Sequence, residues 1–295
     1  MRHAAIAVLM LGLASAAVAQ QSGNNQTPPP ASTAAQPAPS GKRLPQAKTQ
    51  PELDAFNAAM AKANDPAALE KDAQDFAAKF PDSELRVIIY KAAMHGYQSA
   101  NDSDKMTEMG RDVLKLDPDD PEALVGVAEV LAERTRDTDL DKQQRLDEAV
   151  KLAQHATETV DTDVAVPAGT PPEKLADYKN FYRSSAYSVI GAILFNQQKY
   201  ADAEGYFRKS IDALPAQPDP VTVLRLAIAL DKQNKYPDAL KVANQAVELT
   251  QEGTTPGKLA RQERDRLVQL TGGTTPPPAA KPPTGADSGA APPKN

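Results

Sequence analysis

The sequence predicts an all-α protein built from repeated helical hairpins, and three observations support this. Apolar residues recur at helical spacing through residues 51–271, and no strand-like alternation persists there. The chain has only 15 Gly in 295 residues, and its body is rich in the helix-favouring Ala, Leu, Lys and Glu. Finally, one apolar pattern recurs along the body with a constant offset of 16 residues.

The recurring pattern pairs a first-helix anchor with an apolar residue on a second helix. Four pairs are separated by 16 residues, namely Leu53 with Leu69, Tyr90 with Met106, Tyr187 with Ala203, and Val223 with Ala239. In a fifth pair Leu124 and Ala149 are 25 residues apart, so the turn of this hairpin is expected to carry nine extra residues. The alternative is an irregular bundle of Ala-rich helices, and four equal offsets argue against it.

Further signals mark where the individual helices begin and end. Asp65, Asp120 and Asp219 each precede a Pro, which predicts an N-cap followed by the first helical residue. A long helix is expected from about Pro172, and its aromatic residues Tyr178, Phe181, Tyr182 and Tyr187 have the spacing of packing residues. A last helix is expected over 256–270, with one apolar face that caps the array.

The clearest unit spans Ser184 to Pro215. It reads Y-x-x-I-G-x-x-L…A-x-x-x-F…P, carried by Tyr187, Ile190, Gly191, Leu194, Ala203, Phe207 and Pro215. This resembles the tetratricopeptide signature W-x-x-L-G-x-x-Y…A-x-x-x-F…P, and the hairpin starts lie 34 to 37 residues apart where no insertion intervenes. Other hairpins depart from the signature, with Ala73, Gly110, Ala153 and Ala243 where the family has Phe.

The resemblance covers nearly all of the body and implies a fold and a function. The implied fold is a right-handed superhelical solenoid of antiparallel helix hairpins, with about five hairpins plus a capping helix. The implied function is non-enzymatic binding of a peptide or a partner protein on the concave face. The lysine and asparagine clamp with which some relatives hold a C-terminal carboxylate is not recognisable in this sequence.

The residues expected to line the concave face lie on the first helices, on the side turned away from the second helices. They are Lys91, His95, Gln98, Glu129, Glu133, Ser188, Phe195, Asn196, Ile228 and Asp231. The set mixes both signs of charge with amides and one aromatic ring, which suits main-chain hydrogen bonding and one apolar anchor. The alternative is that these residues form ordinary solvated helix faces.

Composition and motifs argue against several other classes of protein. The chain has no Cys, which excludes disulfides, thiolate metal sites and a cysteine nucleophile. Its net charge of −6 argues against non-specific binding of nucleic acid. There is no G-x-S-x-G and no glycine-rich phosphate loop, and His95 and His155 stand alone in the sequence. We therefore expect no enzyme activity, no cofactor and no metal.

One acidic segment within the predicted turn insertion allows a second interpretation. Asp137, Asp139, Asp141 and Glu148 have carboxylate spacing similar to that of an EF-hand loop. Lys142 opposes this, because it stands where such a loop needs Gly and adds a repelling charge. The carboxylate spacing nevertheless leaves an alternative function, a periplasmic module that binds a small ligand or binds Ca²⁺ weakly.

The two ends of the chain predict an exported protein with flexible arms. Residues 1–19 have the basic start, apolar run and small-x-small end of a cleaved secretory signal, with cleavage expected after Ala19. Residues 20–50 and 272–295 are rich in Pro, Ala and polar residues and are expected to be disordered. The sequence thus predicts a periplasmic or secreted scaffold, with cell-envelope biogenesis as a role that would suit it.

Overall fold

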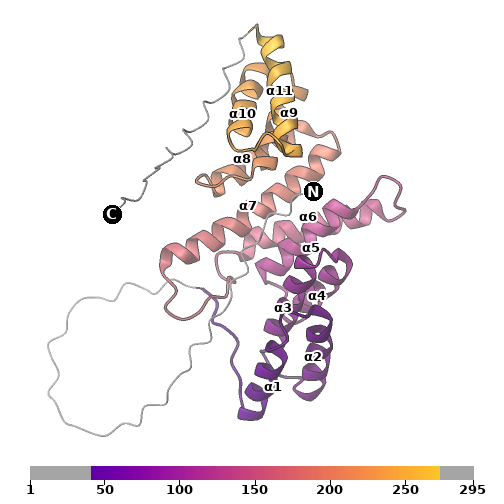
Figure 1. Cartoon of the computed structure of the whole chain (residues 1–295), viewed down its shortest axis with the longest axis vertical. Coiled ribbons are helices and arrows are strands. Elements are labelled where there is room, and N and C mark those ends of the chain that lie inside the picture. The colour runs from indigo at the N-terminus through magenta and orange to yellow at the C-terminus, as the bar shows by residue number, and fades with distance from the viewer. Residues whose placement is uncertain (1–40, 273–295) are drawn as a thin grey trace, which may run out of the picture. The chain divides into compact units, whose positions relative to one another are not determined.

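The computed structural model describes residues 41–272, which form eleven α-helices and no strand (Figure 1). These residues divide into two compact units, the first ending at Pro218 and the second beginning at Asp219. The all-α prediction is confirmed, and within each unit successive helices pack on one another as expected of hairpins. The predicted signal peptide, the arm up to residue 40 and the tail from residue 273 lie outside the described residues.

The first unit contains four helical hairpins. Their helices are α1 (Gln50–Met60), α2 (Pro66–Lys79), α3 (Arg86–Ser99), α4 (Ser103–Leu116), α5 (Pro121–Arg134), α6 (Lys142–Thr159), α7 (Pro172–Asn196) and α8 (Tyr200–Ala213). Each odd-numbered helix packs on the helix that follows it, and α5 also packs on α7. First helices of neighbouring hairpins therefore lie next to one another where α5 meets α7.

The second unit contains three helices. They are α9 (Pro220–Lys232), α10 (Tyr236–Glu248) and α11 (Thr255–Thr271). α10 packs on both of the others, and α11 also contacts α9. None of the helices in residues 41–272 is both long enough and apolar enough to cross a membrane.

Three helices begin at the predicted Asp-Pro pairs. The carboxylates of Asp65, Asp120 and Asp219 accept hydrogen bonds of 3.0, 2.9 and 2.8 Å from the backbone N–H three residues later. Each Pro then occupies the first turn, where its missing N–H removes no helical hydrogen bond. These caps fix the starts of α2, α5 and α9.

Three hairpins close with the same turn geometry. Asn101, Gln198 and Asn234 adopt left-handed backbone conformations with φ of 59°, 61° and 61°. In each turn the N–H of the next residue donates to the carbonyl five residues earlier, at 2.9, 2.9 and 3.0 Å. This is the long hydrogen bond of a Schellman-type helix end. The hairpins α3–α4, α7–α8 and α9–α10 therefore repeat in backbone geometry as well as in sequence.

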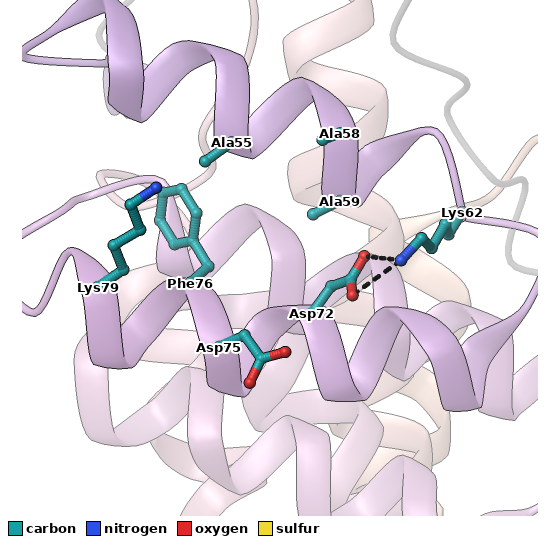
Figure 2. Close-up of a pocket in the computed structure, with 8 residues that line it drawn as sticks. All are labelled: Ala55, Ala58, Ala59, Lys62, Asp72, Asp75, Phe76 and Lys79. Atoms are coloured by element: carbon teal, nitrogen blue, oxygen red, sulfur yellow. Dashed lines mark hydrogen bonds and ion pairs between the residues drawn. The ribbon is translucent and has the colours of Figure 1, made fainter.

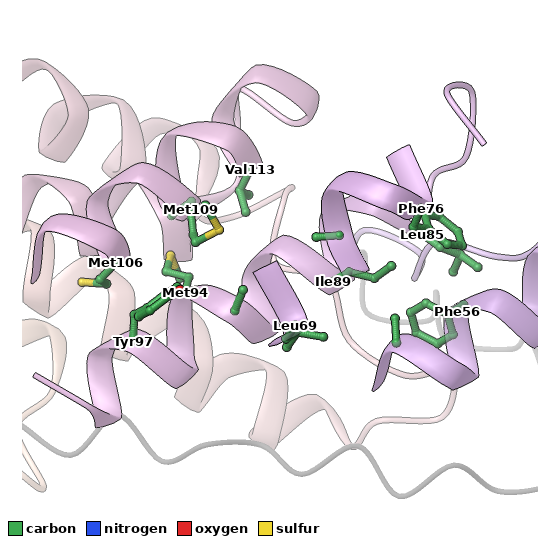
Figure 3. Packing of buried hydrophobic residues seen from close by; sticks show 14 residues of the cluster. Phe56, Leu69, Phe76, Leu85, Ile89, Met94, Tyr97, Met106, Met109 and Val113 are labelled. Atoms are coloured by element: carbon green, nitrogen blue, oxygen red, sulfur yellow. The ribbon is translucent and has the colours of Figure 1, made fainter. Parts of the chain in front are cut away.

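The predicted second-helix anchors are buried. Leu69, Met106, Ala203 and Ala239 are at most 4% exposed. Figure 3 shows Leu69 and Met106 within the core of the first two hairpins, among Phe56, Ile89, Met94 and Met109. Leu53 was predicted to be a first-helix anchor, but its side chain is 37% exposed, because no hairpin precedes α1 in the described residues to cover it.

The helices of the hairpin α7–α8 pack closely at Gly191, a residue of the sequence signature. A Cβ atom on Gly191 would lie 2.6 Å from two ring carbons of Phe207, closer than side chains approach one another. Phe207 is itself fully buried. Gly191 therefore lets the backbone of α7 lie directly against the Phe207 ring.

The longer connection between α6 and α7 has a small core of its own. Val160, Val164 and Leu175 are buried together, with Tyr178 and Tyr182 packed against them. This extra core explains how the chain accommodates the residues that widen the spacing between the third and fourth hairpins. It also confirms the predicted packing role of these two tyrosines.

The ordered body begins earlier than the sequence indicated. Residues 41–49, placed in the disordered arm by composition, run to the start of α1 (Figure 1). They form an isolated parallel bridge between Lys42 and Ala165. The composition of this segment did not indicate its ordered path, because it contains few apolar residues and is held instead by ion pairs of Lys42 and Arg43. We call residues 41–49 the strap.

Candidate functional site

A group of charged side chains lies between first helices of the first unit. Lys91 of α3 forms ion pairs with Asp120, the N-cap of α5, at 2.9 Å and with Glu122 of α5 at 2.6 Å. All three side chains are largely buried, with exposed fractions of 20%, 4% and 12%. Burial opposes the charge of Lys91, but the two carboxylates outweigh it and hold the pKa of the ammonium well above its usual value.

Two further side chains complete the group. His95, one turn after Lys91 on α3, contacts the other oxygen of Glu122 through Nε2 at 2.6 Å. The Tyr182 hydroxyl of α7 hydrogen-bonds the same carboxylate, and burial together with the negative charge of Glu122 raises the pKa of the phenol. Burial works against ionisation of Glu122, yet Lys91 and His95 hold its pKa below the usual value. We call these five residues the Lys91 cluster.

The Lys91 cluster joins three first helices. Glu122 of α5 receives Lys91 and His95 from α3 and Tyr182 from α7. Because each buried polar group loses a partner if the helices separate, the cluster favours one relative placement of α3, α5 and α7. The first helices of hairpins two to four are thereby held as one continuous surface.

Other predicted residues lie on the same helix faces as the cluster. Gln98 follows Lys91 by seven residues, which is about two helical turns, and is partly buried on α3. Glu129 and Glu133 follow Glu122 by seven and eleven residues, about two and three turns, on α5. Glu133 is exposed, whereas Glu129 is partly buried. These residues extend the surface beyond the cluster itself.

The predicted residues on α7 divide into two groups. Ser188 is partly buried in the middle of the helix, and Asn196 is exposed at its last position. Phe195 differs from the prediction, because its ring packs 5.5 Å from Tyr200 and 6.2 Å from Phe207, both on the second helix α8. Phe195 therefore belongs to the α7–α8 hairpin packing and cannot serve as the apolar anchor of a face turned away from α8.

Ile228 and Asp231 lie on α9, in the second unit. Ile228 is partly buried. Asp231 is 8% exposed and forms an ion pair with Arg266 of α11, which also contacts Glu263 at 3.3 Å. Asp231 thus links α9 to α11 and contributes to the internal packing of this unit.

The acidic turn between α5 and α6 does not gather its carboxylates. Asp137 pairs with Lys142 at 2.7 Å, and Glu148 pairs with Arg111 of α4 at 2.8 Å. Asp139 accepts a hydrogen bond of 2.8 Å from the backbone of Arg136. Within residues 41–272, no three His, Cys, Asp or Glu side chains are grouped so that they could hold a metal ion. This arrangement does not favour the calcium interpretation.

A hollow lies between α1 and α2, away from the Lys91 cluster. Figure 2 shows alanines of α1 above Phe76 of α2, with Lys62 and Asp72 joined by an ion pair of 2.8 Å at one end. The hollow offers small alanine side chains and charged groups that already face one another. It lacks the convergent, unpaired polar groups that orient a small ligand.

Two of the five members of the Lys91 cluster were predicted from the sequence. Lys91 and His95 were identified from their helix face, but Asp120 was interpreted only as an N-cap and Tyr182 only as a packing residue. Glu122 was not singled out. The available signal was the sequence Asp120-Pro121-Glu122, which places two carboxylates at the start of a first helix.

Residues 183–213, which form the second part of α7 and the whole of α8, match the family model of the tetratricopeptide repeat. This segment of the chain is therefore similar to a tetratricopeptide repeat. This agrees with the hairpin packing and with the close contact of Gly191 and Phe207 within the matched segment. No curated protein matches the chain in sequence.

Two solved structures are similar to this chain. One is a thermophilic tetratricopeptide repeat protein of Thermus thermophilus, with 14% identity and a TM-score of 0.41, covering 75% of this chain and 98% of that chain. The other is PilF of Pseudomonas aeruginosa, with 17% identity and a TM-score of 0.49, covering 76% of this chain and 96% of that chain.

Proposed function

We propose that this protein is an exported, non-enzymatic scaffold that binds an extended peptide or a partner protein on the first-helix surface of its first unit. Tetratricopeptide hairpins are protein-interaction modules, and the sequence of residues 1–19 has the features of a cleaved secretory signal. The observation that carries the proposal is the Lys91 cluster, which fixes α3, α5 and α7 as one surface.

The contacts of the cluster support binding by a preorganised surface. A rigid surface loses less conformational entropy when a partner binds, so more of the contact energy appears as affinity. Because Lys91 is already held by two carboxylates, it is poorly suited to gripping the carboxylate of a peptide terminus. The partner would instead meet the polar side chains farther along the same faces, Gln98, Glu133 and Ser188.

Affinity capture with the mature chain, beginning at Gln20, tests the proposal. The bait is compared with a variant carrying Gln98→Arg and Glu133→Arg, which places two bulky cations on the proposed surface. Glu133 is exposed and Gln98 is only partly buried, so the fold should persist, and circular dichroism checks that it does. We expect proteins crosslinked to the wild-type bait to be reduced at least about tenfold with the variant.

A matched control changes the same charge on a second helix. Gln154→Arg and Glu158→Arg add the same three units of positive charge on α6, where both residues are exposed. This control should capture the same proteins as the wild type. Equal loss of capture in both variants, or no loss in either, would refute binding at the first-helix surface.

A further inference from the structure

The strap contacts successive inter-hairpin turns through a few side chains. Lys42 forms ion pairs with Asp117 in the α4–α5 turn at 2.6 Å and with Asp163 in the α6–α7 connection at 3.2 Å. Its backbone N–H also donates to the carbonyl of Val164 at 3.1 Å. Attraction to Asp117 and Asp163 exceeds the effect of burial and raises the pKa of Lys42. Two turns that are distant in sequence are therefore held by one residue.

The next residues of the strap reach the third turn. Arg43 forms two hydrogen bonds of 2.8 and 2.7 Å with the carboxylate of Glu84, and Lys48 donates to the carbonyl of Asp82 at 2.7 Å. Both partners lie in the α2–α3 turn. Next to this contact, Glu52 of α1 accepts hydrogen bonds from the strap backbone and from Ser83. The strap thus runs along the edge where the inter-hairpin turns lie.

The charges of the two surfaces are complementary. The strap carries Lys42, Arg43 and Lys48, whereas the turn edge supplies Glu84, Asp117 and Asp163. Gly41 fits closely against the edge, because a Cβ atom there would lie 3.1 Å from the carbonyl oxygen of Val164 and 3.4 Å from Leu175. The contact therefore depends on both charge and shape.

In helical repeat proteins each repeat normally contacts only its neighbours, so stability is a sum of local terms and repeats can open separately. The strap adds to these neighbour contacts direct links between three inter-hairpin turns. We propose that residues 41–49 act as an electrostatic strap that couples the α2–α3, α4–α5 and α6–α7 turns, so that these hairpins open together instead of one by one. This inference does not depend on the identity of any partner.

Amide hydrogen exchange on the full chain tests the strap. In a variant with Lys42→Ala and Arg43→Ala, amides in residues 80–85, 117–120 and 160–166 should exchange about tenfold faster than in the wild type. In the wild type, local opening of these turns must break the ion pairs of the strap, and in the variant these ion pairs are absent. Amides in α9–α11 serve as an internal reference and should not change. Raising the salt concentration to about 1 M should bring the wild type toward the variant.

Further variants separate the strap from a general loss of charge. Lys71→Ala with Arg208→Ala removes two cations that pair with exposed or partly buried carboxylates elsewhere in the first unit, and it should leave these turns unchanged. Gly41→Leu keeps every charge but displaces the strap by steric overlap, so it should accelerate exchange in the same turns. Exchange within about twofold of the wild type in the strap variants, or equal acceleration in the control, would overturn the proposal.

Discussion

Replacing Lys91 by Met would test how strongly the Lys91 cluster holds the first helices together. The substitution keeps the side chain's length and apolar part but removes its charge. Asp120 and Glu122 would then lose the ammonium group that pairs with both of them, in a region where their side chains are only 4% and 12% exposed. Removal of one partner from a buried ion pair is costly because the remaining charge stays buried.

The expected loss follows from the burial of the group. Fully buried pairs lose about 3–5 kcal/mol when one partner is removed, and the 20% exposure of Lys91 reduces this to about 2–3 kcal/mol. With a urea dependence of about 2 kcal/mol/M, the unfolding midpoint should fall by about 1–1.5 M. Urea titration followed by circular dichroism measures this shift. Lys71→Met, which removes an exposed cation, should leave the midpoint unchanged.

A double variant distinguishes the cluster from simple loss of packing. Lys91→Met combined with Glu122→Gln removes one charge of each sign. The double variant therefore keeps less uncompensated negative charge in the buried region than Lys91→Met alone. The two changes together should therefore cost at least about 1 kcal/mol less than the sum of the single changes. Additive losses, or a midpoint unaffected by Lys91→Met, would refute the view that the cluster is a coupled unit.

Three other predictions follow from single residues. The folded-state pKa of Glu122 is lowered, so the contribution of this carboxylate to stability is present above about pH 4.5 and is lost as the pH falls further. In urea titrations at several pH values, Glu122→Gln should therefore make the free energy of unfolding less dependent on pH. Gly191→Ala should destabilise the protein by about 1–3 kcal/mol in thermal unfolding, because the added methyl group overlaps Phe207. Gly205→Ala, in open space on α8, should instead stabilise it by about 0.5–1 kcal/mol in the same assay. Burial and a hydrogen bond to a carboxylate raise the pKa of Tyr97 to about 12, so Tyr97→Phe should reduce the late-titrating part of the tyrosinate absorbance, to which Tyr182 also contributes.

The sequence predicted the elements that depend on local chemistry. Asp65, Asp120 and Asp219 act as N-caps in the structure because a capping residue and its N–H partner lie three positions apart. The second-helix anchors were likewise recovered, since their spacing from the first anchors is fixed by helix and turn length. These features need no knowledge of how the hairpins stack.

The features that escaped prediction depend on contacts between distant residues. Lys42 reaches Asp117 and Asp163 across 75 and 121 positions, and nothing in the local composition of residues 41–49 indicates these partners. Glu122 was overlooked for the same reason, since its role comes from Lys91 and His95 on another hairpin. Phe195 was assigned to the wrong face because a helical spacing alone did not reveal its contact with α8.

The left-handed residues Asn101, Gln198 and Asn234 give the hairpins compatible ends. Each turn leaves its first helix and enters its second through the same backbone path, with hydrogen bonds of nearly equal length. If the chain is divided within these turns, helical segments from different hairpins should therefore be joinable through the same turn without an added linker. An array of this kind can gain or lose a hairpin by recombination while its junctions stay intact.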